Sequence, residues 1–184
     1  MTDALALADP EGAAVAIPGY LRPLTRLGGT AMTVAKAFAL GAAGFGLALA
    51  VQGPLFFAAW TVLLVGWVLV RRRKLVALLR RFEDDTHLLL AGELERATAD
   101  LDALCRESRW VPTYHALFVF FRGVAELDAG NDRRALAILE AVRDSGWFGR
   151  RGFLGGYRGA LHGSIAVAHA MLDEHDEADR KSVV

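Results

Sequence analysis

The segment from Gly146 to Gly159 combines residue types that can bind anions. It reads GWFGRRGFLGGYRG, with a glycine at every third position from 146 to 155 and arginines and aromatic residues between them. A glycine-rich backbone with arginines can hold phosphate, but the GxGxxG and GxxxxGK[ST] spacings are absent. Arginines beside aromatic rings can bind single-stranded nucleic acid, or the rings can enter a bilayer interface while Arg150 and Arg151 contact anionic headgroups. A connector with close helix contacts at Gly156 explains the segment most simply.

Two further sets of residues have types that could bind a metal ion or act as a nucleophile. His162 and His169 are seven residues apart and Asp173 follows four later, so one helix could place them near a metal ion. The HExxH pattern is absent, and ordinary surface histidines explain the spacing better. Cys105 lies next to Arg106, which could lower the pKa of the thiol, but no histidine is close in sequence to activate it. We therefore predict no catalytic residue, no cofactor and no metal site, and do not expect an enzyme.

Two apolar runs dominate the chain, and their location determines where the candidate residues above lie. They cover Ala31–Val51 and Leu55–Val70, with only Gln52, Gly53 and Pro54 between them. A membrane-spanning helix needs roughly 20 apolar residues, so residues 31–70 are predicted to form a transmembrane helical hairpin. The alternative, two core helices of a water-soluble protein, fits the charge-free link and the basic residues that follow less well. A secretory signal is not expected, because some 30 residues precede the first run.

The basic residues predict the orientation of this hairpin. They lie before or at the start of the first run and directly after the second, and none lies in the link. Both termini are therefore expected in the cytoplasm, with the chain integral to a membrane, which the Ala/Gly/Arg-rich usage suggests is a bacterial inner membrane. Residues 71–81 form a basic juxtamembrane segment, and its first four side chains are predicted to contact headgroups: Arg71, Arg72, Arg73 and Lys74.

The net charge, the cysteine count and the N-terminal residues indicate little about function. Lys plus Arg and Asp plus Glu number 21 each, so the net charge predicts no nucleic-acid partner. The single cysteine rules out an intrachain disulfide. Residues 1–30 contain three prolines and few large apolar residues, and are expected to be a flexible N-terminal segment.

Helical periodicity without strand signals follows the hairpin, so the expected fold class is all-α. Apolar residues recur at helical spacing over about 75–90, 94–104, 113–129, 135–142 and 160–172. Glycines at 92, 130 and 146 separate them. Residues 82–184 are therefore predicted to form a small cytoplasmic domain of helical hairpins.

The spacing of small residues in this domain resembles the tetratricopeptide repeat. Gly123, Gly130, Ala135 and Leu139 match the positions where the two helices of such a repeat turn and cross. A second partial match lies 38 residues earlier, against a usual period of about 34, at Gly92, Ala97 and Leu101. Asp85 departs from the pattern, since it stands where the first helix should have a small residue.

The resemblance implies a protein-binding surface. Arg122, Arg133 and Arg134 could contact an acidic peptide, although a solvated helix face is the better interpretation of these residues. The sequence as a whole predicts a membrane-anchored protein-interaction module, an adaptor or scaffold. The alternative is an accessory or assembly subunit that contacts a larger membrane complex through its spans. The expected partners are other proteins and membrane lipid, and a second copy of the chain is also a candidate.

Overall fold

The computed structural model describes residues 15–23, 25, 31, 35–44, 46, 54–150 and 152–182, without the side chains of 54–57 and 174–182. The described residues are helical with no strand, which confirms the all-α class. The α-helices are α2 (Pro54–Leu90), α3 (Leu94–Glu107), α4 (Pro112–Asp128), α5 (Asp132–Asp144) and α6 (Arg158–Ser182). Three short 3-10 helices accompany them, η1 (Gly19–Leu21), η2 (Ser108–Trp110) and η3 (Gly155–Tyr157).

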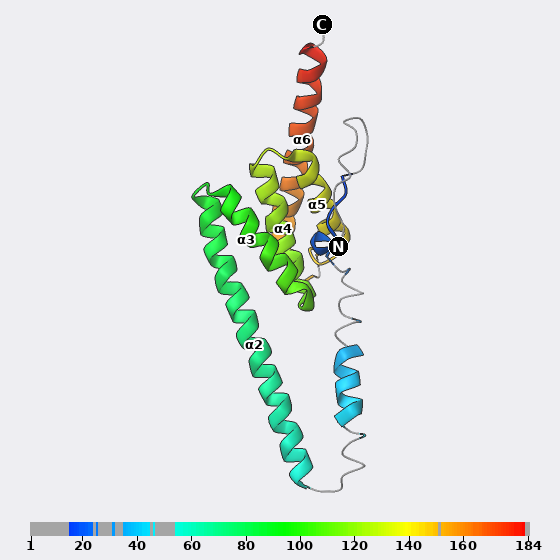
Figure 1. The fold of residues 1–184 in the computed structure, drawn as a ribbon. Helices are drawn as coiled ribbons and strands as arrows, with labels where there is room; N and C mark the ends of the chain where they lie inside the picture. Colours follow the sequence, from blue (N-terminus) through cyan, green and yellow to red (C-terminus); the bar gives the residue numbers. More distant parts are fainter. Residues whose placement is uncertain are drawn as a thin grey trace.

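The longest element, α2, joins the apolar run to the helical domain without a break (Figure 1). Its 37 residues span roughly 55 Å at 1.5 Å per residue. The basic residues 71–74 do not interrupt it, because arginine and lysine are good helix formers. The helix ends just before Gly92, whose φ of 80° is a conformation that favours glycine.

The helical residues 35–44 lie beside the lower half of α2, so the two segments form an antiparallel pair below the domain (Figure 1). Gly44 is buried against the indole of Trp60, and a Cβ at this glycine would lie 2.5 Å from Trp60 Cε2. Glycine therefore permits a close approach between residues 35–44 and the N-terminal half of α2, which we call the two arms.

No helix has a stretch long and apolar enough to cross a bilayer within the described part of the chain. Residues 32–34, 45 and 47–53 and the side chains of 54–57 belong to the predicted hairpin and lie outside the described residues.

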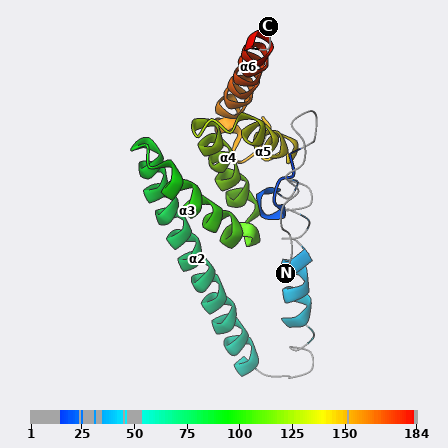
Figure 2. The ribbon, with the colours of Figure 1, turned by 45° about the horizontal axis from the view of Figure 1, so that its top comes forward.

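The helical domain is an array in which each helix packs against the next along the chain, and α6 also contacts α4 (Figures 1 and 2). Its core is built from fully buried side chains of successive helices, including Leu101, Phe118, Leu139 and Leu161. Phe82 ties α2 to this core, with its ring centroid 5.0 Å from that of Phe118. The boundaries predicted from periodicity for α3, α4 and α5 agree with the observed ones within a few residues, whereas α2 already begins at Pro54 and α6 continues to Ser182.

The structure differs from the sequence expectation at the N-terminal segment. Residues 15–23 lie against the helical domain, and η1 contacts α3. Leu21 is fully buried in the core, and Ile17 and Tyr20 pack against it. Part of the segment predicted to be flexible therefore packs on the domain, whereas residues 1–14 lie outside the described residues.

Candidate functional site

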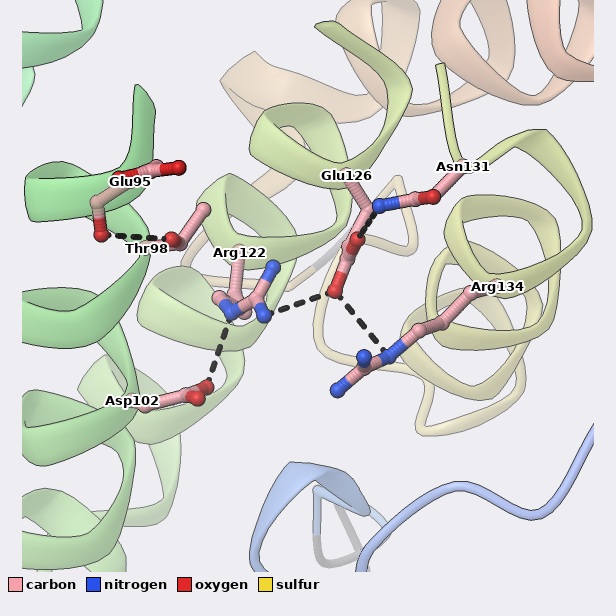
Figure 3. A network of polar contacts seen from close by, with 7 residues as sticks. All are labelled: Glu95, Thr98, Asp102, Arg122, Glu126, Asn131 and Arg134. Atoms are coloured by element: carbon pink, nitrogen blue, oxygen red, sulfur yellow. Dashed lines mark hydrogen bonds and ion pairs between the residues drawn. The ribbon is translucent and has the colours of Figure 1, made fainter. Parts of the chain in front are cut away.

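A buried network of charges connects α3, α4 and α5 (Figure 3). Arg122 in α4 donates from Nε to Asp102 Oδ1 in α3 at 2.8 Å. Its Nη2 lies 2.7 Å from Oε1 of Glu126, one turn further along α4. The same Oε1 is 3.1 Å from Arg134 Nε in α5, and Asn131 Nδ2 donates to Glu126 Oε2 at 2.7 Å. Opposite charges thus meet where three helices join.

This network changes the interpretation of the arginines that were predicted to bind a partner. Arg122 is only 5% exposed, and its guanidinium pairs with Asp102 and Glu126 inside the fold, which leaves little of it accessible to an acidic peptide. Arg134 is half-exposed and also pairs with Glu126. Arg133 is exposed and has an interaction of its own within the fold. The structure therefore supports a packing role for Arg122 and leaves the other two at the surface of α5.

The five small residues predicted at helix crossings fall into two groups. Ala97, Gly123 and Ala135 are buried between helices. A Cβ at Gly123 would lie 2.9 Å from Leu139 Cδ2, so α4 and α5 touch at this glycine. Gly92 and Gly130 instead occupy turns, with φ values of 80° and 75° and open space around them. They are needed for backbone conformation and not for close packing.

Asp85 occupies the crossing between α2 and α3, 38 residues before Gly123. Its side chain is 4% exposed, and Oδ2 has no hydrogen-bond partner among the described residues. Burial, with the nearby charge of Asp100, raises the pKa of this carboxyl to about 6. The first crossing therefore holds an unsatisfied acid where the second holds a glycine.

Three side chains that could act as a nucleophile or a base, those of Cys105, Ser108 and His115, lie in the core of the domain. Ser108 Oγ is 3.2 Å from His115 Nδ1, but both residues are buried, with 0% and 2% exposure. Burial and the charge of Arg109 lower the pKa of His115 to about 4. Burial also raises the pKa of Cys105 far above its ordinary value, so this thiol is the small buried hydrophobe that its position on the helix indicates.

The basic residues predicted to contact headgroups stand at the junction of the two arms and the domain. Arg71 is stacked between two indoles, with its guanidinium carbon 4.4 Å from the ring centroid of Trp67 and 4.8 Å from that of Trp110. The contact with Trp110 joins α2 to η2 at the edge of the helical domain. Arg72, Arg73 and Lys74 are exposed.

The glycine-rich segment is a compact connector between α5 and α6. Trp147, Phe148 and Leu154 point into the core with at most 6% exposure. A side chain at Gly152 would collide with the carbonyl of Trp147, so the glycine permits a tight loop. Arg150 is exposed, and Arg151 lies outside the described residues. The backbone geometry thus agrees with the connector interpretation.

The two described histidines of α6, His162 and His169, belong to no candidate metal site among the described residues. His162, His169 and Asp173 are all exposed, and the part of the chain that the structure describes contains no group of three side chains that could hold a metal ion.

Several partners in these clusters were not found from the sequence. Glu126 follows Arg122 by four residues in a largely apolar helix, and this spacing was a usable signal for an ion pair. Asp102 and Trp110 had no such signal, because their partners come from other elements.

Searches of known protein families, of curated proteins and of solved structures find no match to this chain.

Proposed function

We propose that this chain is a membrane-anchored protein-interaction module. In this proposal residues 31–70 form a hairpin that crosses the membrane twice, both termini lie in the cytoplasm, and the helical domain binds a partner protein. Anchoring raises the effective concentration of the domain near a membrane-bound partner.

One observation carries the anchor: the apolar residues 61–70 of α2 form no buried face. Residues 61–70 are exposed in every direction around the helix, including Val62 at 70% and Leu63 at 65%. A helix that is apolar on all sides is stable in a protein core or in a bilayer, and Figure 1 shows this half extending away from the domain core. The described stretch from Ala58 to Val70 is shorter than the roughly 20 residues required, so the proposal also draws on the apolar sequence before it.

The contact between the arms supports the hairpin. Gly44 lies against Trp60, and small residues that admit a large side chain are typical of helix pairs in membranes. Arg71 is stacked on Trp67 and Trp110 at the domain end of the hairpin. Because tryptophans are enriched at membrane interfaces, the proposal places the interface at this level of α2.

The surface proposed for protein binding is the outer face of α6. Val167 and Met171 lie one turn apart on this helix and are 45% and 44% exposed. In an array where each helix covers its predecessor, this is the face on which the next helix would pack. The tetratricopeptide-like spacing of Gly123, Gly130 and Ala135 further supports a binding role.

The test uses two changes to the full chain. In the first, a flexible Gly/Ser linker replaces residues 31–70. The variant keeps residues 15–23, because Leu21 belongs to the domain core. We expect this variant to leave the membrane and still bind the protein that co-purifies stoichiometrically with the parent. Retention of the variant at the membrane after alkaline extraction would contradict the anchor.

In the second change, Val167→Asp is combined with Met171→Asp. We expect loss of the co-purifying protein, whereas Leu90→Asp should retain it, since Leu90 is 87% exposed but lies on α2. Equal binding by both variants would remove α6 from the proposal.

A second function, an accessory subunit of a membrane complex, is favoured by the space around two glycines of the first arm. A Cβ at Gly41 or Gly46 would meet no atom of the described residues within 4 Å, and small residues of this kind admit another transmembrane helix. Gly41→Leu should release such a subunit from its complex and leave an adaptor bound.

A further inference from the structure

All four tryptophans of the chain line one cavity. The cavity has a volume of about 1310 Å³ and lies between the two arms and the adjoining end of the helical domain. Trp60 and Trp67 reach it from α2, Trp110 from η2, and Trp147 from the connector before α6. Tryptophan is the residue that proteins concentrate at the boundary between lipid and water.

The charged side chains around this cavity are all basic. Lys36, Arg71 and Arg72 contribute to its lining, and no acidic residue does. The arms are antiparallel (Figure 1), and Gly44 packs on Trp60. Lys36, which precedes Gly44 by about two turns, is therefore level with the part of α2 that carries the two arginines. The positive charges therefore gather at the domain end of the cavity.

The other end of the cavity is apolar. Leu40 of the first arm and Leu64 and Val68 of α2 contribute to its walls between the arms. An occupant must therefore be amphiphilic, with a negative group near the domain and a hydrocarbon part that extends between the arms.

We propose that this cavity binds an anionic phospholipid of the cytoplasmic leaflet. The phosphate contacts Lys36 and Arg72, and Arg71 adds positive charge while it remains stacked on Trp67 and Trp110. An acyl chain lies along Leu64 and Val68. This inference rests on the proposed membrane anchor, and it goes beyond the anchor because it assigns a lipid class and a site.

The test reads the four tryptophans directly. The full chain is placed in phosphatidylcholine nanodiscs that contain a fixed fraction of lipid brominated on its acyl chains, either phosphatidylglycerol or phosphatidylcholine. Bromine quenches nearby indoles, so we expect stronger quenching by brominated phosphatidylglycerol. The double variant Lys36→Gln/Arg72→Gln should lose this excess, with affinity falling about five-fold for each charge removed.

The matched control is Arg73→Gln/Lys74→Gln, which removes the same charge from exposed residues that do not line the cavity. It should retain the excess quenching. Equal quenching by the two brominated lipids, or equal loss in both double variants, would overturn the lipid site and leave the anchor intact. Absence of quenching by either lipid would instead contradict the anchor, and the lipid site with it.

Discussion

Replacing Asp85 with asparagine should stabilise the helical domain at neutral pH. The carboxyl is buried between α2 and α3 with one unsatisfied oxygen, and its pKa rises from 3.8 to about 6. Each pKa unit corresponds to 1.36 kcal/mol, so ionisation of this group disfavours the folded state by up to about 3 kcal/mol. Asparagine has nearly the same shape and carries no charge, and it should recover part of this free energy.

The pH dependence follows from the sign of the shift. Because the folded pKa lies above the unfolded one, the folded domain binds more protons between these values, and its stability falls as the pH rises from about 4 to about 6. The gain from Asp85→Asn should therefore be large near pH 8 and small near pH 4.

Urea unfolding of the full chain in mild detergent, followed by tryptophan fluorescence, measures this effect. Asp84→Asn is the control, since Asp84 is an exposed neighbour on the same helix, and it should change stability by no more than about 0.5 kcal/mol. The reasoning is refuted if the two variants behave alike at pH 8, or if the advantage of Asp85→Asn does not shrink at low pH.

The same unfolding assay tests three further features of the domain. Gly123→Ala should cost about 1–3 kcal/mol, because its Cβ would lie 2.9 Å from a core leucine, whereas Gly163→Ala, exposed with open space around it, should gain up to about 1 kcal/mol; equal effects would contradict the close crossing. Arg122→Met should cost about 3–5 kcal/mol because it leaves Glu126 buried without its nearest counter-charge, and adding Glu126→Leu should recover much of that loss. Leu21→Ala should cost about 2–5 kcal/mol, and an unchanged midpoint would show that the N-terminal segment is not part of the folded unit.

The helices of the domain could be predicted from the sequence because their signals are local. Gly92, Gly130 and Gly146 follow the ends of apolar periodic segments, and all three have positive φ. The small residues at Gly123 and Ala135 similarly predicted where α4 and α5 approach each other.

The features that could not be predicted depend on contacts between distant segments. The spacing of Arg122 and Glu126 indicates an ion pair but does not tell a buried pair from a solvated one. The burial of Arg122 depends on α3, which places Asp102 beside it. Leu21 stands in a proline-containing stretch without periodicity, so nothing in the sequence placed it in the core. The stacking of Arg71 on Trp110 likewise joins residues far apart in the chain.

The central claim is that residues 31–70 cross the membrane twice and leave the helical domain in the cytoplasm. Its most direct test is cysteine accessibility in intact cells expressing the full chain with Cys105→Ala, which removes the one native thiol. A membrane-impermeant maleimide should label Gln52→Cys from outside, and should label Asp128→Cys, exposed at the end of α4, only after the cells are opened. Protection of Gln52→Cys in intact cells together with release of the protein by alkaline extraction would contradict the account.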